Sequence, residues 1–240
     1  MKLVLDMHVH TLASGHAYST LYEYIQFAKE NNIELFAQTD HGPAMPGGAH
    51  EYHIGNQIVI PREIEGIQIL RGAEANVIDF DGNIDIREVY LKRLDYVVAS
   101  LHPPVIKPRD VESNTRALIN VMKNPFVDAI AHSGNPQFPI DIVQFVQAAK
   151  DNHVLIEINN SSFTSQSRKG STDNCTLIAD YANTIGAHIV AGSDAHIYCD
   201  LGKFDKVKEV FDIVNMKEEL VVNTSVEKLK AYLRENGKDI

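Results

Sequence analysis

The chain has 240 residues, of which 44% are hydrophobic and 22% are charged, and its formal net charge at pH 7 is −10. This length suits one domain with a substantial core, and the composition excludes a disordered protein. No apolar run has membrane-spanning length, and the first ten residues lack the apolar core of a signal peptide. The two cysteines, Cys175 and Cys199, do not form a disulfide scaffold, so we expect a cytoplasmic protein.

The balance of 32 acidic against 22 basic residues, with no basic tract, argues against binding to long nucleic acids. We expect a monomer or a small homo-oligomer that acts on a small molecule. Histidine is the unusual component, because 11 of them are dispersed along the chain. The question for the sequence is whether these imidazoles converge.

Short apolar runs of strand length alternate with helical patterns along the chain. The runs are mostly continuous rather than alternating, which is typical of parallel strands buried on both faces. They cover residues 3–6, 35–39, 67–70, 96–100, 127–131, 154–158 and 188–191. The helical patterns cover residues 19–31, 110–122, 140–150, 171–184, 204–214 and about 225–234. Ser19 is the expected N-cap of the first helix.

This alternation predicts an α/β fold with a parallel sheet. An open doubly wound sheet would show a glycine-rich turn after its first strand, whereas residues 6–10 read Asp-Met-His-Val-His. We therefore expect a closed β/α barrel with one unit fewer than eight. No linker-like stretch or charge block divides the sequence, which predicts a single domain over residues 1–240.

Histidine or a carboxylate follows six of the seven predicted strands, at the end where chemistry occurs in a parallel barrel. One such histidine is more often structural than a ligand, but their joint placement indicates a metal centre. Ligands of this kind, without thiolates, favour zinc, manganese or iron. In chain order these residues are His8, His10, His41, Glu74, His102, His132, Asp194 and His196, and His16 joins them from the loop after the first strand.

The order of these residues resembles the signature of the PHP (polymerase and histidinol phosphatase) superfamily, and is most similar to the YcdX-type PHP phosphatases. The similarity covers roughly residues 3–235, and combined motifs of this length are specific. The motifs are HAYST at 16–20, TDHGP at 39–43, ILRGAEAN at 69–76, EINNSSF at 157–163, SRKGS at 167–171 and GSDAH at 192–196.

The resemblance implies a distorted (β/α)7 TIM-like barrel of parallel strands with a trinuclear metal cluster at its C-terminal face. It assigns His8, His10, Glu74 and Asp194 to one metal ion. Glu74 would bridge to a second ion that is held with His102 and His132, and the third ion would be held by His16, His41 and His196. Zinc suits these ligands best, and manganese and iron are the alternatives.

The sequence departs from the family pattern beside two ligands. Pro103 follows His102, where some relatives have a carboxylate, and Ser133 follows His132, where proline is common. Both changes affect the surroundings of the ligands and the substrate pocket rather than the ligands themselves. The amidohydrolases also begin with a His-x-His pair, but Glu74 and the Asp194/His196 pair fit the PHP pattern better.

Such a site would hydrolyse phosphate esters. Seven histidines and two carboxylates supply about −2 of ligand charge against about +6 from three divalent ions, so the pocket would attract a phosphate monoester. Adjacent metals can lower the pKa of a bridging water, and the resulting metal-bound hydroxide would attack phosphorus without a protein nucleophile. We therefore predict a metal-dependent phosphatase, that is, a hydrolase acting on phosphoric ester bonds of a small phosphorylated molecule.

Four further residues are candidates for supporting roles, and three of them have two interpretations each. Asp40 could orient His41 from behind, or it could cap a helix or face solvent. Arg168 and Lys169 could contact the substrate phosphate or belong to a solvated basic loop. Arg62 is a weaker candidate for a phosphate contact.

The histidines outside the constellation have simpler interpretations. His50 and His53 are expected in a loop, because Gly47 and Gly48 precede them, and they would line the pocket mouth or lie on the surface. His153 and His188, near the starts of strands, are expected to be structural.

Two other functions remain open at this stage. The first is phosphodiesterase or exonuclease chemistry, as in polymerase-linked PHP domains, and the second is a non-enzymatic metal-binding regulatory domain. Specificity is expected in the loops at about 44–55, 103–110 and 161–172, which fold analogy does not describe.

Overall fold

A computed structural model describes all of residues 1–240. Seven parallel strands follow one another around a barrel in the order β1-β2-β4-β5-β6-β7-β8. The two-residue strand β3 (Glu63–Ile64), which the sequence did not predict, pairs antiparallel with β4. The barrel strands are β1 (Leu5–Val9), β2 (Leu35–Gln38), β4 (Ile67–Asn76), β5 (Tyr96–Ser100), β6 (Ala129–Ile130), β7 (Leu155–Asn159) and β8 (Ile189–Gly192).

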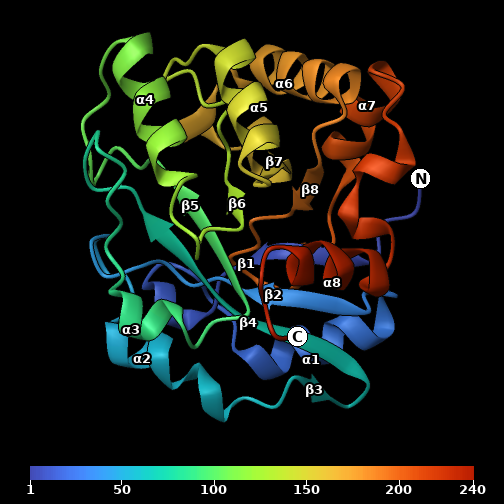
Figure 1. The fold of residues 1–240 in the computed structure, drawn as a ribbon. Coiled ribbons are helices and arrows are strands. Elements are labelled where there is room, and N and C mark those ends of the chain that lie inside the picture. Colours follow the sequence, from blue (N-terminus) through green and yellow to red (C-terminus); the bar gives the residue numbers. More distant parts are fainter.

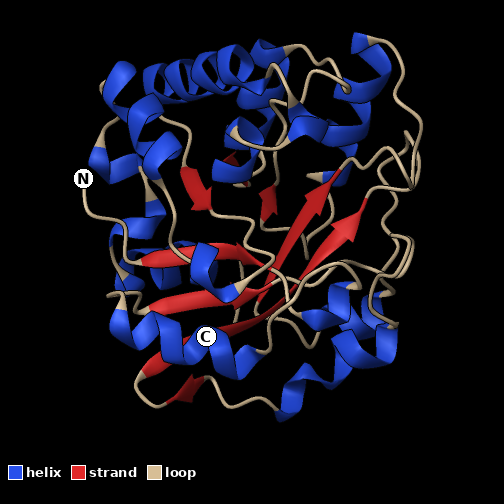
Figure 2. Ribbon diagram, turned by 180° about the vertical axis from the view of Figure 1, so that it is seen from behind, coloured by secondary structure: helices blue, strands red, loops and turns tan.

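Helices surround the strands, which occupy the middle of the molecule (Figures 1 and 2). The helices α4 to α7 lie together on one side of the sheet, and α1 to α3 lie on another (Figure 1). The helices are α1 (Leu21–Glu30), α2 (Glu51–Asn56), α3 (Glu88–Leu91), α4 (Val111–Val121), α5 (Ile142–Asp151), α6 (Ser171–Ile185), α7 (Asp205–Ile213) and α8 (Val226–Glu235).

The barrel is closed unevenly between its first and last strands. At their C-terminal ends, Asp194 N donates to His8 O at 2.9 Å. Further down, the side chain of Asn223 fills the gap: its Oδ1 accepts from Ala191 N at 2.6 Å and its Nδ2 donates to Leu5 O at 2.9 Å. The predicted distorted barrel of seven parallel strands is therefore confirmed.

Residues that point into the barrel change in character from one end to the other. Apolar side chains fill the N-terminal half, and α8 covers that end with Val226, Leu229 and Leu233. Side chains alternate along a strand, so Leu70 and Glu74, four residues apart, share the inner face of β4. The buried Leu70 belongs to the apolar half, and Glu74 lies nearer the C-terminal end. The apolar inner cluster includes Leu5, Met7, Leu35, Leu70, Tyr96, Val98, Leu155 and Val190.

The predicted helices form, but two local expectations are wrong. Thr20, not Ser19, is the N-cap of α1, and its reciprocal hydrogen bonds with Glu23 make a capping box. Residues around His53 form helix α2 rather than a loop, because His50 caps the helix by accepting from Tyr52 N at 3.1 Å. Gly47 and Gly48 precede this N-cap and lie outside the helix.

None of the helices combines the length and the apolar character that a membrane span requires.

Candidate metal centre

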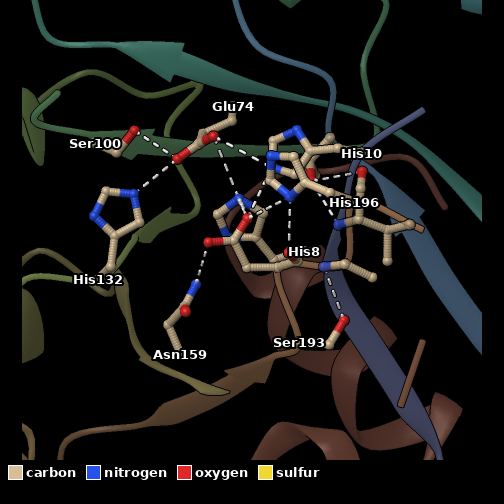
Figure 3. A network of polar contacts seen from close by, with 12 residues as sticks. His8, His10, Glu74, Ser100, His132, Asn159, Ser193 and His196 are labelled. Carbon is tan, nitrogen blue, oxygen red and sulfur yellow. Dashed lines mark hydrogen bonds and ion pairs between the residues drawn. The ribbon is translucent and has the colours of Figure 1, made fainter. Parts of the chain in front are cut away.

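Glu74, on the inner face of β4, lies at the centre of a cluster of imidazoles (Figure 3). Its Oε1 atom is 3.2 Å from His102 Nε2 and 3.0 Å from His132 Nε2. Its Oε2 atom is 3.4 Å from His8 Nε2 and 3.5 Å from His10 Nε2. The two carboxylate oxygens therefore face two separate groups of nitrogen donors, as a carboxylate that bridges two ions would.

Asp194, which follows β8, supplies the second carboxylate of the cluster. Its Oδ1 atom is 3.1 Å from His10 Nε2 and 3.7 Å from His8 Nε2. His8 and His10 reach it from the end of β1, because side chains two residues apart point the same way. Three triplets have donor atoms within 4.8 Å of one another, namely His8–His10–Asp194, His41–Glu74–His102 and His10–His41–His196.

His16 is the outermost of the nine predicted ligands. Its ring centroid is 5.0 Å from that of His41 and 4.9 Å from that of His196. It belongs to none of the three triplets, and it is more exposed than the others. The structure therefore brings all nine predicted residues to one end of the barrel, with His16 at the edge.

The second ring nitrogen of four of these histidines is held by a group that is not itself a predicted ligand atom: three side chains outside the cluster and one backbone carbonyl. Such contacts fix the tautomer and leave the other nitrogen, Nε2, free to bind a metal. His8 Nδ1 lies 2.7 Å from Glu157 Oε1, His10 Nδ1 3.0 Å from Ser14 Oγ, His102 Nδ1 2.8 Å from Asn76 Oδ1 and His196 Nδ1 2.9 Å from the carbonyl oxygen of Asp194.

Asp40 supports the cluster from behind, but through Ser14 rather than through the ring of His41. Its Oδ1 accepts from Ser14 Oγ and from Thr11 N, both at 2.7 Å. Ser14 Oγ in turn contacts His10 Nδ1 and accepts from His41 N at 3.2 Å. Asp40 is fully buried, which does not fit the cap or solvent interpretation.

Four buried polar atoms in the cluster make no hydrogen bond of good geometry, namely His8 Nε2, His10 Nε2, His41 Nδ1 and Glu74 Oε2. They nevertheless crowd together, since His41 Nδ1 is 2.6 Å from Glu74 Oε2 and His10 Nε2 is 3.1 Å from Asp194 Oδ1. Buried polar atoms are normally satisfied, so a concentration of orphans needs an explanation. Imidazole nitrogens and carboxylate oxygens are ligands for divalent metal ions, and these atoms converge from different strands. The residues present therefore fit a bound metal cluster.

Two of the predicted ligands have backbone conformations that residues other than glycine rarely adopt. His132 has φ of 35° and Asp194 has φ of 58°. Such strain persists where surrounding contacts fix the backbone, and it is concentrated at functional sites. Here His132 N donates to Glu157 Oε2 at 2.9 Å, and Asp194 N donates to the carbonyl oxygen of His8.

The surroundings favour the ionised forms of both carboxylates. Burial alone would raise their pKa values, but the interactions with neighbouring imidazole and guanidinium groups outweigh it. His102, followed by His41, holds the pKa of Glu74 well below its usual range, and Arg168 does so for Asp194. His132 is instead kept neutral, because burial lowers the pKa of its imidazole to about 4.

A cavity of about 740 Å³ opens above the cluster. The loop after β7 delivers Arg168 to it, and the Nη1 atom of Arg168 donates to Asp194 Oδ2 and to Asn159 Oδ1, at 2.6 and 3.2 Å. Lys169 is exposed and does not line the cavity. Pro103 lines it, whereas the buried hydroxyl of Ser133 has no hydrogen-bond partner.

The structure places Arg62 away from the cluster. Its guanidinium pairs with Asp95 Oδ1 at 2.7 Å, at the N-terminal end of β5, so it does not reach the metal face. His53 lines a separate cavity of about 580 Å³, and its Nε2 is 3.7 Å from Asp40 Oδ2. His188 packs against Tyr232 with ring centroids 5.0 Å apart, in keeping with a structural role.

Sequence reasoning did not assign roles to Glu157, Ser14 and Asn76, which hold the rings of three ligands. For Glu157 and Asn76 the signal was periodicity, whereas Ser14 lies in the turn at Leu12–Ser14 after β1, which no strand pattern marks. Glu157 lies two residues after the buried Leu155 on the inner face of β7, and Asn76 lies two residues after Glu74 on β4. An inward polar residue beyond an apolar inner position therefore marks the ligand layer of this barrel.

Comparison with known proteins identifies the family. The PHP domain family model matches residues 6–238. The chain belongs to the PHP domain family. The predicted family membership is thus confirmed, and the curated relatives carry names that agree with the predicted enzyme class.

A probable phosphatase of Acetivibrio thermocellus is 53% identical over 234 residues, covering 98% of this chain and 96% of the relative. A probable phosphatase of Caldanaerobacter subterraneus is 53% identical over 241 residues, covering 100% of this chain and 94% of the relative. Among solved structures, histidinol phosphate phosphatase of Lactococcus lactis, complexed with zinc, L-histidinol and phosphate, has a TM-score of 0.59. Its sequence identity is 14%, with 89% of this chain and 94% of that chain covered, so it shares the fold.

Proposed function

We propose that this PHP protein is a metal-dependent phosphatase that hydrolyses a small phosphate monoester at a centre of three divalent ions, with zinc as the expected metal. The observation that carries the proposal is the two-sided position of Glu74, whose oxygens face His8 and His10 on one side and His102 and His132 on the other. The phosphatase names of relatives with 53% identity support the reaction.

The three sites would use the nine converging side chains. His8, His10, Glu74 and Asp194 would hold one ion, and Glu74 with His102 and His132 would hold the second. The third would be held by His16, His41 and His196, whose rings are mutual neighbours. When bound, these ions would lower the pKa of a water and neutralise charge on the phosphate.

The protein's own groups would bind and orient the ester. Arg168 lines the cavity beside Asp194, and its Nη2 and Nε atoms have no protein partner, so they are available to a phosphate oxygen. Asp40 would position His10 and His41 through Ser14. Lys169, which is exposed, and Arg62, which pairs with Asp95, receive no role in the reaction.

The proposal is tested by phosphate release from simple monoesters. Enzyme stripped of metal and reloaded with zinc or manganese should hydrolyse them, and Glu74→Gln should lose both bound metal and more than about 100-fold of kcat/KM. The exposed Glu34→Gln is the matched control and should behave as wild type. Metal binding without hydrolysis of any monoester would favour the regulatory alternative, and selective cleavage of a short DNA oligomer would favour the exonuclease alternative.

The remaining expectations stay predictions. They are a single domain over residues 1–240, a cytoplasmic location, a monomer or small homo-oligomer, and no role for long nucleic acids. The family match over residues 6–238 supports the first of these.

A further inference from the structure

The cavity above the cluster has walls of contrasting chemistry. The loops after β2 and β5 contribute an apolar surface made of Met45, Pro46, Pro103 and Pro104. The loops after β6 and β7 contribute neutral hydrogen-bonding side chains instead, and these are Asn135, Gln137, Ser161, Ser165 and Ser167. These walls lie beyond the metal ligands, so they face the part of the substrate that leaves with the ester oxygen.

Asn135 is the most informative member of the polar wall. Its side chain is part of a residue that is only 6% exposed, and its Oδ1 accepts from Gln137 N at 3.1 Å. This contact orients the amide, and Nδ2 is left without a partner in the protein, at the cavity wall. The Nδ2 atom is not enclosed by protein atoms, so it is accessible from the cavity and can donate to an acceptor on a ligand.

The serines extend this wall and are held in place. Ser165 Oγ and Ser167 Oγ lie 2.7 Å apart, and Gln137 Nε2 donates to Ser167 O at 2.6 Å, which ties the β6 and β7 loops together. Hydroxyl groups both donate and accept hydrogen bonds. The wall thus presents donors and acceptors without charge, which is the complement of a ligand that carries several hydroxyl groups.

Other classes of leaving group find no match here. None of the residues that line the cavity is Phe, Tyr or Trp, and its only aromatic rings are the imidazoles of the proposed metal ligands, so a nucleobase has no dedicated stacking partner. Apart from the metal ligands, the charged lining residues are Arg168 and Asp200. Asp200 Oδ1 pairs with Lys203, and this pair reduces the negative charge that a cationic leaving group would meet at the cavity.

We propose that the substrate is the phosphate monoester of a small polyhydroxyl compound, such as a sugar or a polyol, with Asn135 and the serine wall binding its hydroxyl groups. This inference rests on the proposed phosphatase function. The apolar wall would pack against the carbon-bound hydrogens of such a ligand. In the reaction the ester P–O bond breaks, water supplies the new P–O bond, and the leaving alkoxide takes up a proton derived from that water.

The test compares kcat/KM of the metal-loaded enzyme for esters with similar alkoxide leaving groups. Glycerol 3-phosphate and D-ribose 5-phosphate carry hydroxyl groups, whereas n-butyl phosphate has none. We expect the hydroxylated esters to be preferred by at least about 10-fold, since each neutral hydrogen bond contributes about 2- to 10-fold. Equal or better hydrolysis of n-butyl phosphate, O-phospho-L-serine or AMP would overturn the substrate class while leaving the phosphatase function intact.

Two variants test whether the polar wall causes the preference for hydroxylated esters. Ser165→Ala and Asn135→Asp should each lower the ratio of kcat/KM for glycerol 3-phosphate to that for n-butyl phosphate by about 3- to 10-fold. Asn135→Asp keeps the acceptor for Gln137 N, removes the donor and adds a negative charge. The charge acts on every phosphate ester, so the ratio of kcat/KM values isolates the loss of the donor. Ser113→Ala on α4, outside the cavity, should keep the wild-type ratio. Unchanged ratios in both cavity variants would contradict the assignment of this wall, and failure to hydrolyse every monoester would overturn the proposed function itself.

Discussion

Glu157 Oε1 lies 2.7 Å from His8 Nδ1, and both side chains are buried at the inner face of the barrel. The carboxylate accepts a hydrogen bond from Nδ1–H, so the imidazole presents Nε2 to Glu74 and Asp194. The same carboxylate accepts from the strained backbone of His132 through Oε2. Glu157 is therefore a positioning residue for two predicted ligands on different strands.

Glu157→Gln should weaken metal binding by about 10- to 100-fold, because an amide holds the His8 tautomer less firmly and no longer carries a compensating charge. Competition with a chromophoric chelator measures the affinity. The exposed Glu112→Gln on α4 is the control for the substitution itself. Wild-type metal affinity in Glu157→Gln would show that the contact with His8 is not needed to prepare the ligand.

Asp40→Ala should destabilise the fold around the first loop. The carboxylate accepts from Thr11 N, Ser14 Oγ and Gln38 Nε2, and its removal leaves these buried donors without an acceptor. We expect a loss of about 3 kcal/mol or more in the free energy of unfolding, measured in urea. The exposed Asp173→Ala should change stability by less than about 0.5 kcal/mol.

In the metal-free protein, His132 should make the free energy of unfolding depend on pH. Burial, followed by the charge of Arg168, lowers its pKa from 6.5 to about 4. The unfolded chain therefore binds the extra proton first, and this residue's contribution to stability is lost as pH falls from about 6.5 toward 4. The full effect is on the order of 3 kcal/mol.

The difference in unfolding free energy between wild type and His132→Asn, measured in urea from pH 7.5 to 4.5, isolates this contribution. Acidic groups such as Asp6, whose pKa burial raises to about 6, titrate in both proteins and cancel. A difference that does not change with pH would contradict the neutral, buried state of His132.

His16→Ala should remove one metal ion per chain and most of the phosphatase turnover, because His16 is the outer ligand beside His41 and His196. Elemental analysis and phosphate release measure the two effects. His50→Ala, which alters an exposed histidine at the start of α2, should keep both. Full activity in His16→Ala would contradict the three-ion arrangement.

Eight of the nine proposed ligands could be predicted from the sequence because each lies at a strand end, where the period of a strand fixes which residues share a face. His16 comes from the loop after β1. The surroundings of the ligands could not be predicted. Asp40 is adjacent to His41 in sequence, yet it acts through Ser14, 26 residues away. Arg62 resembles a phosphate contact by type alone, but the register of β3 and β4 places it at the other end of the barrel, beside Asp95.

The closure of the barrel was equally hidden. Asn223 follows the last predicted strand by more than thirty residues and completes the gap between Leu5 and Ala191 through side-chain hydrogen bonds. No local pattern marks such a residue. The need for glycine at position 192 was hidden in the same way. A Cβ there would overlap Glu157 Oε1 and His8 Cβ, and this constraint exists only once three strands are assembled.

The most direct test of a convergent metal centre is the metal content per chain, measured by elemental mass spectrometry on protein purified without a metal-affinity column or chelator. The nine converging side chains predict a total near three ions, as in the three sites proposed above. A total of one or less, unchanged after zinc or manganese is supplied, would contradict the metal centre and the hydrolytic function built on it.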